Sequence, residues 1–296
     1  MIHSILEKIG NTPLVRLREV TKGLSPQVEV YVKVEYLNPG GSVKDRPAFR
    51  MIREAIASGD LTKDKIIMDP TSGNTGVAYA MIGAALGYSV ELVVPENVSQ
   101  QRKNIANSFG AKLTFSSAME GSDGAIRLAR KLKAEHPEKY FMPDQYNNRF
   151  NPQAHYDTTG VEIYEQTGKR ITHFITGIGT SGTVMGVSRR LKDYSPKIKT
   201  YASEPSESLH GLEGLKHMAS SIVPGIYHPE ILDGVLPIDT EDGYEMAERL
   251  AKEEGLFVGH SSGSNVASAL KIARDLKEGL VVTILCDHGD RYIPLM

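Results

Sequence analysis

The chain has 296 residues, of which 40% are hydrophobic and 24% charged, with a net charge of −2. This length suits two domains of ordinary size, and the charge excludes the broad basic surface that nucleic acids or anionic membranes attract. A single cysteine, Cys286, excludes an internal disulfide framework and favours a reducing compartment. We expect the cytoplasm, because the start MIHSILEKIGNTPL lacks a secretory pattern and no apolar run approaches the ~20 residues of a spanning helix.

Short apolar runs alternate with longer helical patterns. The predicted strands are, in order, residues 28–34, 66–68, 90–94, 112–115, 172–176, 198–202 and 280–285. The predicted helices are residues 43–57, 75–86, 101–109, 124–134, 182–191, 242–254 and 265–276. This alternation is typical of α/β folds with mostly parallel sheets, whose strands are covered on both faces. The polar stretch 144–153 is a candidate boundary between two groups of these units.

The first of four glycine-rich loops is NPGGSVKDR, residues 38–46. Its two glycines permit a sharp turn, Ser42 is a candidate N-cap, and Asp45 favours the first helical turn. Lys44 is then expected in that first turn, where the helix dipole disfavours a cation and favours the neutral amine that Schiff-base formation needs. The alternative is a surface lysine at a helix start, and this segment alone favours that alternative.

The second loop is PTSGNTG, residues 70–76, directly after a predicted strand. Its hydroxyl and amide groups, together with backbone N–H groups at a helix N-terminus, could form a cup for a carboxylate or phosphate. The alternative is a well-capped helix, and the residue types alone do not decide between the two.

The third loop is GIGTSGT, residues 177–183, and it matches G-x-G-x-x-G. With Glu204 near the end of the next predicted strand, the loop could bind a dinucleotide. The same geometry holds any phosphate at a helix N-terminus, and the extra hydroxyls suit a compact phosphate monoester. A Walker lysine is absent from the loop, which argues against nucleoside triphosphate hydrolysis.

The fourth loop is GHSSGS, residues 259–264, which we expect to join a strand to a helix. Taken alone, this loop is best interpreted as a serine N-cap of the following helix. Ligands of open α/β sheets bind at the carboxyl ends of the strands. All four loops are expected near such ends, so they could converge on one cleft.

In this order the loops resemble the cysteine synthase and cystathionine β-synthase family of pyridoxal-phosphate enzymes of fold type II. Further similarity lies in IGNTPLVRL (9–17), DQYNN (144–148), NPQAHYDTTG (151–160) and CDHGDRY (286–292), so the resemblance covers essentially the whole chain. It implies two domains, each with a mostly parallel twisted sheet flanked by helices, as in the β subunit of tryptophan synthase. The larger domain would comprise residues 1–37 and 151–296, and the smaller, mobile domain residues 38–150. A homodimer is also implied.

The resemblance implies a role for each loop around the cofactor, pyridoxal 5'-phosphate. Lys44 would form a Schiff base with the cofactor aldehyde and act as the base at the substrate α-carbon, and Asn74 would bind the ring hydroxyl. Ser261 would face the pyridine nitrogen as a neutral partner. The phosphate would be held by Gly179, Thr180, Ser181, Gly182 and Thr183. The substrate carboxylate would be held by Thr71, Ser72, Asn74, Thr75 and Gln145.

The segment 210–229 looks more like cysteine synthase B than the principal cysteine synthases. We therefore expect L-cysteine to be formed from O-acetylserine. O-phosphoserine would compete as a substrate if Lys216 binds an anionic leaving group; the alternative is that Lys216 is a solvated surface lysine. Departures in the same segment put the family's partnership with serine acetyltransferase in doubt. Cystathionine β-synthase is the nearest alternative function, and an NAD-dependent dehydrogenase is the alternative from another class. We expect no metal site, and we interpret His155 as a hydrogen-bonded structural histidine.

Overall fold

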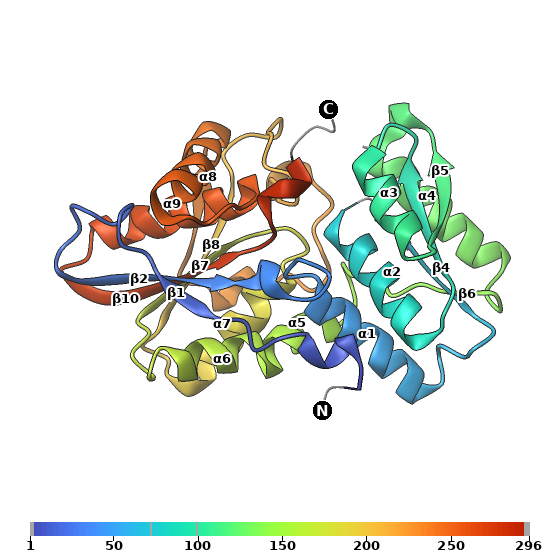
Figure 1. The fold of residues 1–296 in the computed structure, drawn as a ribbon, viewed down its shortest axis with the longest axis horizontal. Helices are drawn as coiled ribbons and strands as arrows, with labels where there is room; N and C mark the ends of the chain where they lie inside the picture. Colours follow the sequence, from blue (N-terminus) through green and yellow to red (C-terminus); the bar gives the residue numbers. More distant parts are fainter. Residues whose placement is uncertain (1–2, 72, 99, 293–296) are drawn as a thin grey trace.

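The computed structural model describes residues 3–71, 73–98 and 100–292 (Figure 1). It contains two sheets, each flanked by helices, which confirms the expected α/β fold. No helix among the described residues is both long and apolar enough to cross a membrane.

The larger sheet has six strands in the order β1-β2-β10-β7-β8-β9. Only β1 runs antiparallel to its neighbour; the other pairs are parallel. Strands from the two ends of the sequence pair in this sheet, because Val34 on β2 lies opposite Leu285 on β10. The strand bounds are β1 (Leu14–Arg16), β2 (Gln27–Val34), β7 (His173–Gly177), β8 (Lys199–Pro205), β9 (Gly234–Ile238) and β10 (Glu278–Leu285).

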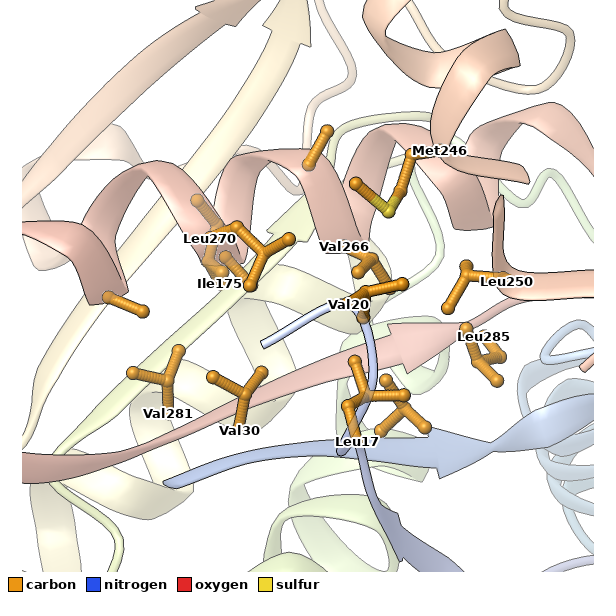
Figure 2. Packing of buried hydrophobic residues seen from close by; sticks show 14 of the residues in the cluster. Leu17, Val20, Val30, Ile175, Met246, Leu250, Val266, Leu270, Val281 and Leu285 are labelled. Atoms are coloured by element: carbon orange, nitrogen blue, oxygen red, sulfur yellow. The ribbon is translucent and has the colours of Figure 1, made fainter. Parts of the chain in front are cut away.

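Helices cover both faces of this sheet, which explains why successive residues of β7 and β10 are buried. On one face α8 (Thr240–Glu254) and α9 (His260–Arg274) bury residues such as Met246, Leu250, Val266 and Leu270 against Val30 and Val281 (Figure 2). On the other face α6 (Thr159–Gln166) and α7 (Gly182–Tyr194) contribute to a second cluster with residues of β7 and β10. Helix α5 (Phe150–Asp157) packs against α7 and against α1 (Asp45–Ser58).

The smaller sheet has four parallel strands in the order β5-β4-β3-β6. Helices α1, α2 and α3 pack on one face and α4 on the other. The bounds are β3 (Ile66–Pro70), α2 (Asn74–Leu86), β4 (Val90–Pro95), α3 (Gln100–Ser108), β5 (Lys112–Ser116), α4 (Gly121–Glu135) and β6 (Tyr140–Phe141).

All seven predicted strands and all seven predicted helices are present, with shifted ends. The strands β1, β6 and β9 and the helices α5 and α6 were not predicted. One expectation about a loop is wrong: α9 begins at His260, so residues 260–264 form the first turns of a helix. The residues directly before α9 belong to neither sheet, and Val258 forms only an isolated bridge with His288.

Candidate active site

Lys44 lies where the 38–44 loop enters α1, and it is half-buried. The loop backbone is tied to the end of β10: the N–H of Val43 donates to the carbonyl of Cys286 at 2.8 Å, and Ser42 forms a bridge with Asp287. The hydroxyl of Ser42 accepts from the N–H of Lys44 at 3.2 Å. Lys44 therefore occupies the N-cap position, one residue before the helical turn in which the sequence pattern placed it.

Ser261 lies in the first turn of α9 and is buried. Its side chain lies near the thiol of Cys286, and the amide nitrogen of Asn265 lies 3.4 Å from the same sulfur. Burial raises the pKa of Cys286 to about 11, although the nearby charge of Lys44 opposes this shift, so the thiol is neutral. Lys44, Ser261 and Cys286 thus meet at the carboxyl end of β10.

The 177–183 loop connects β7 to α7 and is shaped by close approaches. A Cβ at Gly179 would lie 2.3 Å from the carbonyl oxygen of Gly214, and one at Gly182 would lie 1.8 Å from Oδ1 of Asn151. Ser181 adopts a left-handed φ of 72°, which is costly for a residue with a side chain. Its buried hydroxyl oxygen has no hydrogen-bond partner in the described part of the chain.

The geometry of this loop fits a cofactor phosphate. A buried, unpartnered hydroxyl, backbone that only glycine permits and a helix N-terminus together form a donor-rich cup for a compact anion. The hydroxyl oxygen of Thr180 accepts from the Asn151 amide at 3.1 Å and can still donate its own hydrogen. The loop is therefore suited to hold the phosphate of pyridoxal phosphate.

The 71–75 loop connects β3 to α2, and its polar groups bind other segments. The hydroxyl of Thr75 donates to Oε1 of Gln145 at 2.8 Å. The amide of Asn74 donates to Asp287 at 2.7 Å, and its oxygen accepts from Arg291. Thr71 is buried, whereas the predicted site residue Ser72 lies outside the described residues.

Asn151 connects this loop to the phosphate cup. Its amide nitrogen donates to the backbone carbonyl of Gln145 at 2.7 Å as well as to Thr180. The 71–75 loop, Gln145 and the 177–183 loop therefore form one hydrogen-bonded series. The other three loops contact residues 286 and 287 directly, and the 177–183 loop is joined to them through Asn151, Gln145 and Thr75.

Asp69 lies at the end of β3, directly before the 71–75 loop, and is fully buried near Tyr79. Burial raises the pKa of Asp69 to about 8, although the neighbouring hydroxyl group of Tyr79 opposes this shift. The carboxyl group is therefore protonated over much of the neutral range.

The segment around Lys216 packs on the 177–183 loop. The N–H of Lys216 donates to the carbonyl of Ile178 at 2.8 Å, and its amino group lies 5.1 Å from the ring of Tyr146. Lys216 is half-buried, and burial lowers its pKa. The carboxylate of Glu204 accepts a hydrogen bond from the N–H of Met218 at 2.8 Å and so holds this segment in place. The dinucleotide interpretation would instead require Glu204 to bind a ribose hydroxyl.

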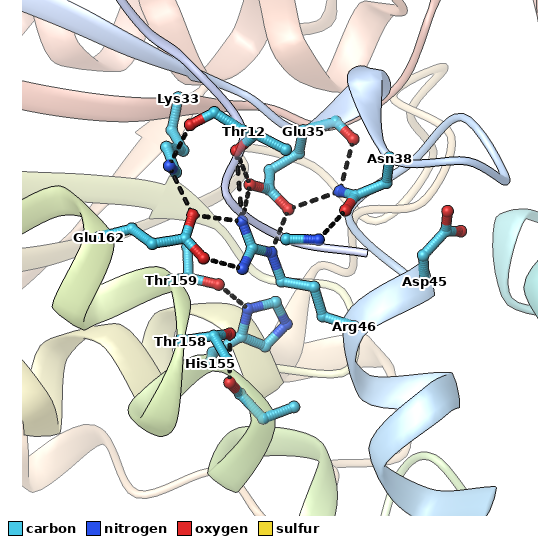
Figure 3. Close-up of polar contacts among 12 residues, drawn as sticks. Thr12, Lys33, Glu35, Asn38, Asp45, Arg46, His155, Thr158, Thr159 and Glu162 are labelled. Atoms are coloured by element: carbon cyan, nitrogen blue, oxygen red, sulfur yellow. Dashed lines mark hydrogen bonds and ion pairs between the residues drawn. The ribbon is translucent and has the colours of Figure 1, made fainter. Parts of the chain in front are cut away.

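A buried ionic network lies behind α1 (Figure 3). Arg46 forms paired hydrogen bonds with Glu35, both at 2.7 Å, and with Glu162, at 2.6 and 2.8 Å. Lys33 also binds Glu162, at 2.6 Å. Burial opposes ionisation of Glu162, but Arg46 and Lys33 outweigh it and lower its pKa to about 2. The network fixes α1 two residues after Lys44.

A cavity of about 760 Å³ lies elsewhere, between α5, α7 and residues 225–231. Its lining contains none of the residues predicted for the cofactor or the substrate. A small space of about 10 Å³ lies beside Asn74 and is lined by Arg291 and Tyr292.

Sequence reasoning did not assign functions to Asn151, Asp287 or Arg291. The signal was present, since NPQAH and CDHGDRY carried part of the resemblance. The sequence could not show that Asn151 would lie behind Thr180, nor that Asp287 would lie beside Asn74. No group of three or more potential metal-binding side chains occurs among the described residues.

Comparisons with known proteins agree with this geometry. The family model described as "Pyridoxal-phosphate dependent enzyme" matches residues 5–287. The cysteine synthase of Aquifex aeolicus is 48% identical over 295 residues, covering 98% of this chain and 90% of its own length. Cysteine synthase B of Escherichia coli is 42% identical over 291 residues, covering 98% and 94%.

Solved structures share the fold over the whole chain. A cysteine synthase from Entamoeba histolytica has a TM-score of 0.94 and 38% identity, covering 99% of this chain and 89% of its own. An O-acetylserine dependent cystathionine beta-synthase from Helicobacter pylori has a TM-score of 0.92 and 34% identity, covering 99% and 97%. The chain belongs to the family of pyridoxal-phosphate dependent enzymes, in its cysteine synthase group.

Proposed function

We propose that the chain forms L-cysteine by replacing the β-substituent of an activated serine, O-acetylserine or O-phosphoserine, with sulfur. The observation that carries this proposal is the meeting of the Lys44 loop, Ser261 and Asn74 at residues 286–287, next to a phosphate cup. A dehydrogenase would leave Lys44 without a function, and the family assignment removes that alternative.

When bound, pyridoxal phosphate supplies an aldehyde for covalent attachment and an electron sink for the α-carbon. Lys44 would hold the cofactor, take the α-proton and return it to the product. Residues 179–183 would hold the phosphate. Ser261 would give the ring nitrogen a neutral partner; a carboxylate there would favour a protonated ring. This choice favours β-elimination over reactions that need a stronger electron sink.

The substrate carboxylate would bind Thr71, Ser72, Asn74 and Thr75, with Gln145. The bond of Thr75 to Gln145 supports this assignment because it holds both groups at one place. Binding there would close the smaller domain, residues 38–150, over the larger one and exclude water from the reacting atoms.

Visible absorbance of the purified protein tests the function. A cofactor band should be present, should shift when O-acetylserine is added without a thiol, and should return when sulfide is added. Lys44→Ala should lose the covalently attached cofactor and at least about 100-fold in turnover. A colourless protein that cannot be reconstituted would overturn the proposal.

Homocysteine is the alternative nucleophile, and the similarity to the Helicobacter pylori enzyme is the observation that favours it. The same experiment separates the two. Return of the band with sulfide but not with homocysteine selects cysteine synthesis, and the reverse selects cystathionine synthesis.

Lys216 would select the leaving group. Its half-buried position beside the 177–183 loop supports a contact with an anionic substituent. Lys216→Ala should lower kcat/KM for O-phosphoserine about tenfold and leave that for O-acetylserine unchanged. An unaltered ratio of the two would contradict this assignment.

We further propose a homodimer and a cytoplasmic location. The first rests on the family resemblance and the second on the single cysteine. Sedimentation at several protein concentrations tests the dimer. Binding of a peptide from the C-terminus of serine acetyltransferase tests the partnership that the 210–229 segment puts in doubt.

A further inference from the structure

Two side chains of α5 lie directly behind the phosphate cup. Asn151 and His155 are four residues apart and so share one face of α5, and both are almost completely buried. They contact Thr180 and Thr183 respectively. The function proposed above assigns no role to either of these α5 residues, so their contacts call for a separate explanation.

Glycines of α7 make this contact possible. A Cβ at Gly182 would lie 1.8 Å from Oδ1 of Asn151, and one at Gly186 would lie 2.2 Å from the carbonyl oxygen of Pro152. The two helices therefore approach so closely that side chains of α5 reach the hydroxyl groups at the start of α7 from behind.

The hydrogen-bond direction at Thr180 follows from Asn151. The atom of Asn151 that contacts Thr180 also lies 2.7 Å from the carbonyl oxygen of Gln145. A carbonyl only accepts, so this atom must be the amide nitrogen, and it donates to Thr180 as well. The hydroxyl hydrogen of Thr180 is then left to donate elsewhere.

His155 stands in the same relation to Thr183. Its Nε2 lies 3.3 Å from the hydroxyl oxygen of Thr183, and its Nδ1 lies 2.9 Å from that of Thr159 (Figure 3 shows the second contact). Burial, assisted by the positive charges of Arg46 and Lys44, lowers the pKa of His155 to about 3. The imidazole is therefore neutral, with one donating and one accepting nitrogen.

We propose that Asn151 and His155 are positioning residues that donate to Thr180 and Thr183 from behind and so direct both hydroxyl hydrogens forward to the cofactor phosphate. A phosphate dianion only accepts hydrogen bonds, so each threonine must donate to it. Nε2 of His155 then carries the hydrogen, and Thr159 donates to Nδ1. The inference rests on the proposed binding of pyridoxal phosphate by this loop.

The test compares cofactor binding with and without the phosphate group. Apo-protein, prepared by removing the cofactor with hydroxylamine, is titrated with pyridoxal phosphate and with pyridoxal. His155→Leu should weaken pyridoxal phosphate about tenfold or more and leave pyridoxal unchanged. His155→Gln, whose amide can again donate to Thr183, should recover most of the loss. Equal weakening of both ligands, or no weakening of either, would overturn the inference.

The wild-type protein provides a measurement that does not depend on whether the variants fold. Nitrogen-15 NMR should show His155 as the neutral imidazole with hydrogen on Nε2 from pH 5 to 8. Hydrogen on Nδ1, or a charged ring, would overturn the inference. If wild type binds pyridoxal phosphate but His155→Leu behaves identically, only this inference fails; if wild type binds none, the proposed function fails.

Discussion

The 177–183 loop and the 71–75 loop both lead from a parallel strand into a helix, yet they are built differently. The first is packed from behind by Asn151 and Gly214, and its glycines have no room for a side chain. The second is held by hydrogen bonds to Gln145, Asp287 and Arg291, which can be exchanged for a ligand. One loop is rigid before anything binds, whereas the other owes its conformation to partners that a substrate can replace.

Adding a methyl group to a glycine of each loop is the strongest test of this comparison. Gly182→Ala should weaken pyridoxal phosphate by about 10- to 100-fold, because the new Cβ would overlap Asn151. Gly73→Ala is the matched control: a Cβ there has no neighbour within 4 Å and the backbone φ is −107°. It should bind the cofactor like wild type in a fluorescence titration. Similar losses in both variants would show that the 177–183 loop is not the more rigid one.

Removing one hydroxyl from each loop should separate cofactor from substrate. Thr75→Val leaves the buried Gln145 oxygen without its donor, so the KM for O-acetylserine should rise about tenfold while cofactor affinity stays unchanged. Thr180→Val should do the opposite and weaken the cofactor. Steady-state kinetics at saturating cofactor, together with cofactor titration, measure both. A rise in KM without loss of cofactor affinity in Thr180→Val would contradict the division.

A further effect concerns stability beneath the 71–75 loop rather than activity. The folded pKa of Asp69 is about 8, above its ordinary value of 3.8, so between these values the folded state holds a proton that the unfolded state has lost. The group's contribution to stability is therefore complete below pH 3.8 and falls as the pH rises towards 8, by at most about 1.4 kcal/mol per pH unit. Asp69→Asn should flatten this slope in urea unfolding measured from pH 5 to 8.

The exposed Asp275 provides the control for this measurement. Asp275→Asn should retain the wild-type slope. A slope that stays unchanged in Asp69→Asn would mean that another group causes the loss of stability at higher pH.

The sequence predicted the architecture because the strands that form both sheet interiors are short apolar runs. It missed α5 because FNPQAHYD mixes apolar and polar residues without a helical stripe, and its helix is stabilised by packing on α7 and α1. It missed β9 because GVLPI contains a proline and lies at a sheet edge. Loop chemistry indicated the phosphate cup, but distances through space were needed to find Asn151, Asp287 and Arg291 around it.

The pairing of β2 with β10 has a consequence for synthesis on the ribosome. Residues 66–141, which supply all four strands of the smaller sheet, emerge together, so that sheet can form early. Strand β2 emerges near the beginning, but its parallel neighbour is residues 278–285. Strand β1 can cover one edge of β2 early, but Val28, Val30 and Val32 lack their parallel neighbour until residues 278–285 are made. The nascent chain therefore exposes one unpaired edge of β2 until β10 is made, and nonsense mutations that remove β10 should cause aggregation rather than a shortened enzyme.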